Sequence, residues 1–249
     1  MKVKHLVGAF LCVLGCYACS SPKTEVQSPD GHIKMTLTVD ENGKPFYNVS
    51  VDDSLLIENS AMGFTAANGI ILAEGFQVKN TTFSSEDETW TQPWGENKKN
   101  RNHYNEMAVS LTNEDQVQLT LRFRVFDDGI GFRYEYTVPT VDSLLITDEL
   151  TTFRFHRDGT SWSIPASAET YELLYQQQPI SEVETANTPF TFKTADGVYG
   201  SIHEAALYDF PEMTLKQIGH YTLKAELAPW PDGINCLLYT SDAADDMQC

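Results

Sequence analysis

Cysteine is missing from the whole body of this sequence. Three cysteines lie in the first twenty residues and two in the last fourteen, and none occurs between Ser20 and Asn235. The body therefore excludes a small disulfide-stapled scaffold and a zinc site built on cysteine ligands.

Positive charge is also scarce. The 249 residues include 17 Lys and Arg against 35 Asp and Glu, for a formal net charge of -18. This balance argues against binding to nucleic acid, whose phosphates are neutralised by basic side chains, and against adhesion to anionic lipid. No apolar run of about 20 residues follows the N-terminal segment, so no membrane-spanning helix is predicted in the body. Nucleophile-elbow, P-loop and dinucleotide-binding motifs are missing too.

The body does contain short runs in which apolar and polar residues alternate. Residues 33–39 and 46–51 read as two strands separated by turn residues. The clearest hairpin has apolar odd positions over residues 117–125, a turn at 127–129 and an aromatic return strand at 132–136. Helical periodicity is nearly absent, which favours an all-β domain.

Further short apolar or β-branched runs support the same fold class. They occur at residues 144–146, 152–155, 191–193, 198–202 and 221–227. Hydrophobic residues at 41% and aromatics at 11% exclude a disordered polymer. With no internal repeat or linker dividing the body, we expect one β-sandwich domain of antiparallel sheets over residues 24–235.

The first nineteen residues resemble a bacterial export signal. Lys2 and Lys4 precede a short apolar core, and small residues follow. Acylation of Cys16, or of Cys19 as a looser second candidate, would make the protein an outer-membrane lipoprotein. The alternative is a cleaved signal that leaves a soluble periplasmic protein.

The last fourteen residues, 236–249, differ from the body. Their sequence resembles one translated frame of a transposase adapter used in sequencing libraries. On this interpretation the tail is an artefact and the natural chain continues past residue 235. The alternative is a natural acidic tail.

Aromatic and polar side chains are densest over residues 86–106, which include Trp90, Trp94, Arg101 and His103. Such a mixture suits carbohydrate, because an aromatic face stacks on the C–H surface of a sugar ring while amides and carboxylates bond its hydroxyls. It also suits a long loop whose tryptophans anchor it on another domain. The residues alone leave both interpretations open.

Two smaller acidic groups carry weaker signals. His203 and Glu204 are neighbours after an apolar run, and no second histidine lies four residues on, which favours a structural pair. Glu169 and Glu172 lie in a polar segment, but calcium takes six to eight oxygens, so two carboxylates make an incomplete site. Carboxylates for glycoside hydrolysis cannot be chosen among 35 acids without geometry.

Several segments keep a fixed order along the chain. They are Ser28-Pro29-Asp30-Gly31, Glu88-Thr89-Trp90, Pro93-Trp94-Gly95-Glu96, Arg101-Asn102-His103-Tyr104-Asn105-Glu106, Arg122-Phe123-Arg124, Asp128-Gly129-Ile130-Gly131-Phe132-Arg133-Tyr134-Glu135, Lys193-Thr194-Ala195-Asp196-Gly197 and His203-Glu204-Ala205-Ala206-Leu207. Together they resemble the N-terminal region of glycoside hydrolase family 97, and the resemblance covers the body between the two unusual ends.

The resemblance implies a fold and a function. The fold is an all-β, galactose-mutarotase-like β-supersandwich, followed in the family by a catalytic (β/α)₈ barrel and a small C-terminal β domain. Members are exported bacterial enzymes that act on α-glucosides or α-galactosides with a calcium ion at the site. Because their catalytic carboxylates lie on the barrel, this chain carries none and is expected to be inactive alone.

The resemblance also implies one calcium ligand in the sandwich, within a Thr-x-Glu stretch after an Ile-Pro. That pattern falls on Thr170-Tyr171-Glu172, so Glu172 is the expected ligand. The preceding Ala166-Ser167-Ala168 departs from the family pattern, and a shifted alignment would select Glu169 instead.

The resemblance shifts the interpretation of the other candidates. Trp90, Trp94 and His103, with Arg101, then suit a surface that docks on the barrel, and His203 and Glu204 suit the rim of the active site. The competing hypothesis is a complete chain that works as a carbohydrate-binding or scaffold lipoprotein.

Overall fold

Antiparallel sheets make up nearly all of the computed structural model, which describes residues 24–139, 141, 143–167, 170–208, 210–228 and 234–237, the last four and residue 68 by backbone alone. Within this part of the chain, strands β1 to β20 form five four-stranded sheets. The all-β prediction is confirmed. No helix in the described part has the length and hydropathy needed to cross a membrane.

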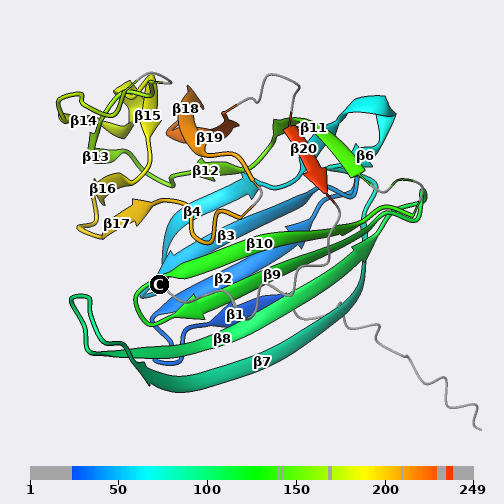
Figure 1. The fold of residues 1–249 in the computed structure, drawn as a ribbon, viewed down its shortest axis with the longest axis horizontal. Coiled ribbons are helices and arrows are strands. Elements are labelled where there is room, and N and C mark those ends of the chain that lie inside the picture. The colour runs from blue at the N-terminus through cyan, green and yellow to red at the C-terminus, as the bar shows by residue number, and fades with distance from the viewer. Residues whose placement is uncertain are drawn as a thin grey trace, which may run out of the picture.

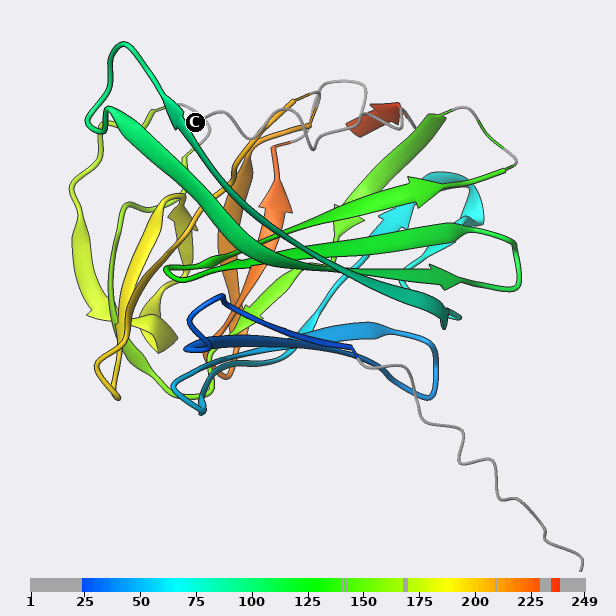
Figure 2. The ribbon, with the colours of Figure 1, turned by 90° about the horizontal axis from the view of Figure 1, so that it is seen from below.

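Two sheets stack to form the first sandwich, one in the order β1-β2-β3-β4 and the other in the order β10-β9-β8-β7. The strand bounds are β1 Glu25–Gln27, β2 Ile33–Val39, β3 Pro45–Val51, β4 Ser54–Ala61, β7 Gln77–Thr91, β8 Lys99–Thr112, β9 Gln118–Phe126 and β10 Ile130–Thr137. Figure 2 shows the two layers edge-on, with the blue strands of the first sheet beneath the green strands of the second.

The predicted alternation over residues 117–125 places one face of β9 in the core. Leu119, Leu121, Phe123 and Val125 are fully buried, and Val117 just before the strand is 1% exposed. Burying each of these side chains contributes roughly 1.5–3 kcal/mol. The stability of the first sandwich therefore rests on the period-2 pattern that the sequence displays.

Three further sheets, shown above the first sandwich in Figure 1, complete the fold. Their orders are β20-β11-β5-β6, β12-β19-β18-β15 and β14-β13-β16-β17. The bounds are β5 Phe64–Ala66, η1 Ala67–Gly69, β6 Ile71–Leu72, β11 Ser143–Glu149, β12 Thr152–Arg154, β13 Gly159–Ser163, β14 Gln176–Pro179, η2 Ile180–Glu182, β15 Thr185–Asn187, β16 Phe190–Thr194, β17 Tyr199–Ile202, β18 Met213–Gly219, β19 Thr222–Leu227 and β20 Ile234–Leu237.

One continuous core joins the upper sheets to the first sandwich. Ile57 of β4 forms a β-bridge with Phe155, just past β12. The Phe155 ring in turn meets Phe192 of β16 edge to face, with centroids 4.8 Å apart. Phe155 thus packs between β4 and β16, which fixes the position of the sheet that contains β13 and β16.

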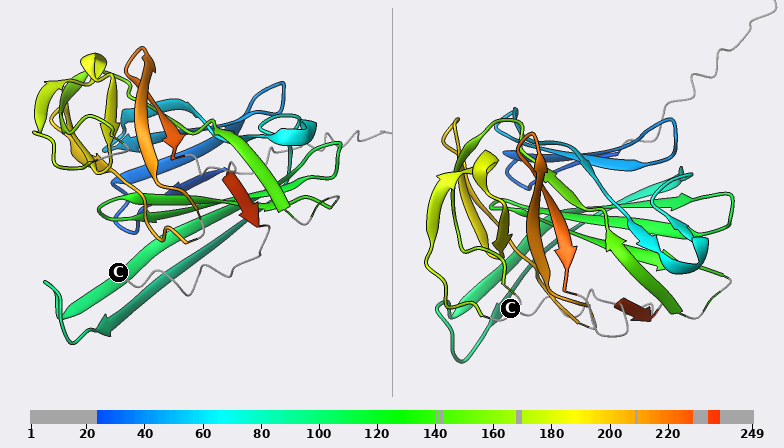
Figure 3. Two further views of the ribbon diagram at one scale, coloured as in Figure 1. Left: turned by 45° about the horizontal axis from the view of Figure 1, so that its top comes forward. Right: turned by 90° about the horizontal axis from the view of Figure 1, so that it is seen from above.

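The polar–aromatic segment is a two-stranded ribbon, so its interpretation as a long loop is wrong. β7 and β8 pair from Gln77↔Thr112 to Thr91↔Lys99. Figure 3 shows this hairpin projecting beyond the sandwich. Past the sandwich no other described sheet packs on the ribbon, so its sequence needs no apolar alternation.

The structure describes only part of the two ends of the chain. The predicted export segment 1–19, with Cys16 and Cys19, lies outside the described residues. Of the predicted tail 236–249, residues 236 and 237 belong to β20, whose backbone pairs with β11 at Leu144 and Ser143. The rest of that tail lies outside the described residues.

Candidate functional site

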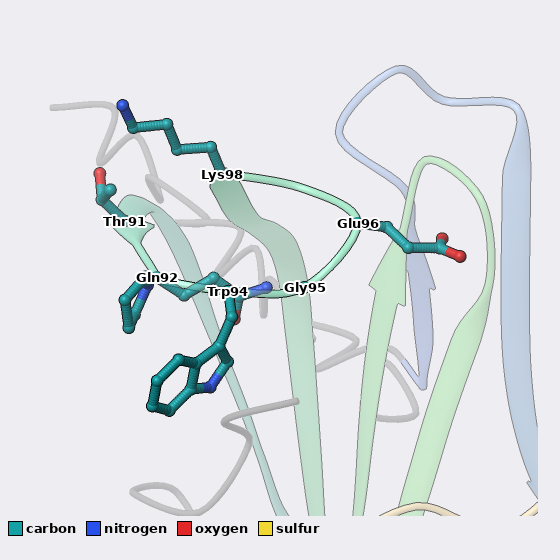
Figure 4. A pocket seen from close by; sticks show the side chains of 7 residues that line it. Thr91, Gln92, Trp94, Gly95, Glu96 and Lys98 are labelled. Carbon is teal, nitrogen blue, oxygen red and sulfur yellow. The ribbon is translucent and has the colours of Figure 1, made fainter.

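The tip of the β7–β8 hairpin carries Trp90 and Trp94. Trp94 is 84% exposed, whereas Trp90 at the end of β7 is partly buried opposite Asn100. An open depression at the tip is lined by residues 91–96 and 98. Figure 4 shows the Trp94 and Glu96 side chains pointing in different directions. The tip is therefore an exposed surface whose polar groups do not converge on one bound molecule.

Arg101 and His103 lie on the opposite face of the ribbon from Trp90, because successive residues of a strand alternate. Arg101 donates to Asp87 through Nε to Oδ1 at 2.7 Å and Nη2 to Oδ2 at 2.8 Å. These hydrogen bonds lower the pKa of the Asp87 carboxyl. His103 Nδ1 lies 3.8 Å from Asp127 Oδ2 in the β9–β10 turn. The structure thus groups Arg101 with His103 and separates both from Trp90.

A charge network on β8, β9 and β10 lies beside this ribbon. Glu106 accepts hydrogen bonds from Arg122 Nη1 at 2.5 Å and Arg124 Nε at 2.8 Å. Arg122 Nε also donates to Glu135 at 2.8 Å. Burial alone would raise the pKa of Glu106, but the bonds from Arg124 and Arg122 outweigh it and lower the pKa. These groups neutralise one another, which indicates a structural network.

This network was not predicted from the sequence, although its signal was present. The four residues belong to segments quoted for the family resemblance, and they occupy alternate positions on neighbouring strands. Such cross-strand pairs stabilise a sheet face.

Glu172 lies in the segment between β13 and β14. Its backbone N–H donates to Thr170 Oγ1 at 3.0 Å, and its side chain is exposed. Its neighbours are apolar and exposed as well: Tyr171 by 53% and Leu174 by 89%. Glu169 lies outside the described residues. No group of three or more His, Cys, Asp or Glu residues within the described part of the chain is arranged to hold a metal ion.

His203 and Glu204 lie just past β17 and have different environments. Glu204 accepts hydrogen bonds from Thr188 Oγ1 at 2.5 Å and from the backbone N–H of Met213. It thereby joins two segments of the upper sheets. His203 is exposed. The contacts of Glu204 match the structural role that the residues alone favoured.

Glu149, at the end of β11, is a buried carboxyl that was not identified from the sequence. Its side chain accepts one hydrogen bond, from Thr151 Oγ1 at 2.6 Å, and the residue is 7% exposed. Burial raises its pKa to about 7, with Glu204 and Asp148 adding to the effect against Thr151 and Lys224. Only burial distinguishes this glutamate, and the sequence carries no signal for it.

The stacked antiparallel sheets define the chain as an all-β sandwich domain. The domain also presents an open polar–aromatic surface at the tip of the β7–β8 hairpin. The chain belongs to the family described as "Glycosyl-hydrolase 97 N-terminal", which matches residues 26–236. The suspected family resemblance is confirmed.

Known relatives are longer proteins. A retaining alpha-galactosidase from Bacteroides thetaiotaomicron is 25% identical over 246 residues, covering 92% of this chain and 36% of that protein. A glycoside hydrolase family 97 enzyme from Pseudoalteromonas sp. strain K8, solved in complex with panose and with acarbose, has a TM-score of 0.81 and 37% identity, covering 86% of this chain and 33% of that one. A beta-arabinopyranosidase at 22% identity and a TM-score of 0.73 shares the fold. This chain spans about a third of the length of each.

Proposed function

We propose that this chain is the N-terminal domain of an exported, calcium-dependent α-glycoside hydrolase that acts on α-linked glucosides or galactosides. The observation that carries the proposal is the family match over residues 26–236, in a chain about a third as long as its relatives. One relative is a retaining alpha-galactosidase, and another holds the oligosaccharides panose and acarbose in its crystals. Catalysis then belongs to the part of the relatives that this chain does not match.

The carboxylates of this domain support that division of labour. Asp87, Glu106 and Glu135 are each paired with an arginine. Glu204 accepts two hydrogen bonds that join segments of the fold, and Glu149 is buried. Hydrolysis needs two carboxyl groups on either side of a glycosidic bond, accessible to the sugar. These five groups therefore act in the fold. We expect the chain alone to be inactive because catalysis belongs to the part of the relatives that this chain does not match.

Glu172 fits the role of a calcium ligand shared with the rest of the enzyme. Its carboxylate is exposed and makes no ion pair or hydrogen bond with another described residue. Calcium takes six to eight oxygens, so a single carboxylate contributes to a site that other parts of the complete protein must finish. When bound, the ion would polarise oxygens of the substrate or of water.

The surface around Glu172 suits contact with the catalytic barrel. Leu173, Leu174 and Tyr175 are exposed beside it, and contiguous exposed apolar residues mark interaction sites. A barrel packed on this segment would bury the apolar side chains and bring its own oxygens to Glu172. Trp94 at the hairpin tip is a second anchor for the same partner.

The proposal is tested on the complete reading frame recovered from the source DNA by sequencing past the codon for Asn235. Its product should hydrolyse an aryl α-glucoside or an aryl α-galactoside, and removing calcium should abolish the activity. Glu172→Gln should raise the calcium concentration for half-maximal activity by at least about tenfold, the equivalent of about 1.4 kcal/mol.

Glu182→Gln is the matched control, because Glu182 in η2 is also exposed, and it should leave the calcium dependence unchanged. A native stop codon directly after Cys249 would contradict the proposal. So would a complete enzyme that is indifferent to calcium.

A further inference from the structure

The outer face of the sheet β14-β13-β16-β17 carries two aromatic rings from residues that belong to no common sequence motif. Trp162 of β13 pairs with Thr191 of β16, and Lys193 of β16 pairs with Tyr199 of β17. Residues that pair across neighbouring strands project from the same face. Trp162 and Tyr199 therefore flank β16 on one face, although 37 positions separate them in the sequence.

The two rings lie nearly parallel, in a stacked pair, over β16. Their planes lie within 15° of each other, and their centroids are 6.5 Å apart. Tyr199 is 64% exposed, and Trp162 is partly exposed. The Lys193 ammonium lies 4.8 Å from the centroid of the Tyr199 ring, a cation–π contact that helps to hold the ring in place. We refer to Trp162, Tyr199 and Lys193 as the aromatic platform.

The backbone beneath the aromatic platform is fixed by the core. A Cβ at Gly200 would lie 2.5 Å from the Phe192 ring, so only glycine allows β17 to pack this closely on the buried face. Phe192 is itself 4% exposed. Since Gly200 and Phe192 face inward, Tyr199 and Ser201 are held outward on a rigid base.

Neutral hydrogen-bonding groups surround the aromatic platform. Gln177 of β14 lies opposite Trp162, and Thr191 and Ser201 continue the same row across β16 and β17. All three are exposed. None of the outward positions of these four strands is acidic, and Lys193 is their only charged residue.

We infer that the aromatic platform binds the hexopyranose rings of a neutral oligosaccharide and holds them without cleaving them. An exposed aromatic surface stacks on the C–H face of a sugar ring, and the amide and hydroxyl groups around it can satisfy the sugar hydroxyls. A surface with no carboxylate lacks the pair that hydrolysis requires. The inference goes beyond the proposed function, because it assigns the domain a binding surface of its own.

The chemistry of the face favours a sugar over a protein partner. The row of amide and hydroxyl side chains offers paired donors and acceptors, as a polyhydroxylated ligand needs. A protein anchored by the same rings would be expected to bury an apolar centre there. The large apolar side chains beside the sheet belong instead to the segment around Glu172.

The test is calorimetric titration of the purified chain with maltoheptaose, and separately with the α-galactoside stachyose. We expect at least one of them to bind with a Kd of roughly 1 mM or tighter. Trp162→Ala and Tyr199→Ala should each weaken binding about three- to tenfold, whereas Tyr199→Phe keeps the ring and should stay within about twofold. Tyr208→Ala is the matched control, because Tyr208 is 66% exposed and lies off this sheet.

A second variant separates loss of binding from loss of folding. Thr191→Arg leaves the core untouched and places a long cation on β16 directly beside Trp162, so it should abolish binding with an unchanged melting temperature. The inference is overturned if neither sugar binds at 10-fold the expected Kd, or if the platform variants bind like the wild type. It is also overturned if the complete enzyme fails to bind while the chain alone binds, because the rest of the protein then covers the platform. Loss of hydrolysis with binding retained would count against the proposed function alone.

Discussion

Replacing Glu149 by glutamine should stabilise the protein at alkaline pH. The carboxyl is 7% exposed and accepts a single hydrogen bond, from Thr151 Oγ1. The Thr151 hydroxyl also contacts the Tyr134 hydroxyl at 2.6 Å. Glutamine has nearly the same size, and its amide oxygen can accept the same bond from Thr151. The substitution therefore removes the ionisable group and preserves the packing.

The magnitude follows from the pKa of Glu149, which burial raises from 4.5 to about 7. Because the folded state holds this proton more tightly than the unfolded state, the wild type has its full stability below about pH 4.5 and loses stability as the pH rises to about 7. A difference of about 2.5 pKa units corresponds to roughly 3 kcal/mol, an upper estimate because local relaxation reduces it.

Urea unfolding of the wild type and of Glu149→Gln at pH 5 and pH 8 measures the effect. We expect the variant to exceed the wild type by up to about 3 kcal/mol at pH 8 and by much less at pH 5. Glu114→Gln, in the turn after β8, removes an exposed carboxyl and serves as the control. A variant that is less stable than the wild type at pH 8, or an equal difference at both pH values, would refute the argument.

Three further substitutions test other parts of the fold by the same unfolding assay. Glu106→Gln should destabilise the protein by about 2–3 kcal/mol at pH 7, because it weakens charged hydrogen bonds to Arg122 and Arg124. Since the pKa of Glu106 is lowered in the folded state, this difference should shrink as the pH falls below about 4.5, and a difference that grows in acid would contradict it. Trp94→Ala should change stability by less than about 0.5 kcal/mol, because the side chain is 84% exposed; a larger loss would mean that the hairpin tip supports the fold. Gly159→Ala should cost at least about 1–3 kcal/mol, because its Cβ would collide with the Lys193 carbonyl oxygen across the β13–β16 pair, and an unchanged midpoint would count against this packing.

The sequence predicted the strands whose two faces have different environments. β2, β3, β9 and β10 alternate because one side packs in the sandwich, and the period-2 pattern records that. The outer half of the β7–β8 ribbon has no such pattern, since residues 84–89 of β7 are exposed on both faces. Its strand character comes from pairing with its own return strand, which local hydrophobicity does not encode.

The sequence did not show which of the candidate site residues lie together in space. Arg101 and His103 share a face, as strand alternation allows, but Trp90 lies on the other side of the ribbon. The aromatic platform joins Trp162 and Tyr199 across an intervening strand, and only the register of three strands reveals it. The raised pKa of Glu149 depends on burial by segments distant in sequence, so no sequence motif predicts it.

The calcium dependence of hydrolysis by the complete gene product tests the central claim most directly. The account predicts that an aryl α-glucoside or α-galactoside is cleaved only with calcium present, that the 249-residue chain alone cleaves neither, and that Glu172→Gln shifts the calcium requirement upward. Hydrolysis by the chain alone at an enzyme's rate would contradict it, and so would full activity of the complete protein after calcium is removed.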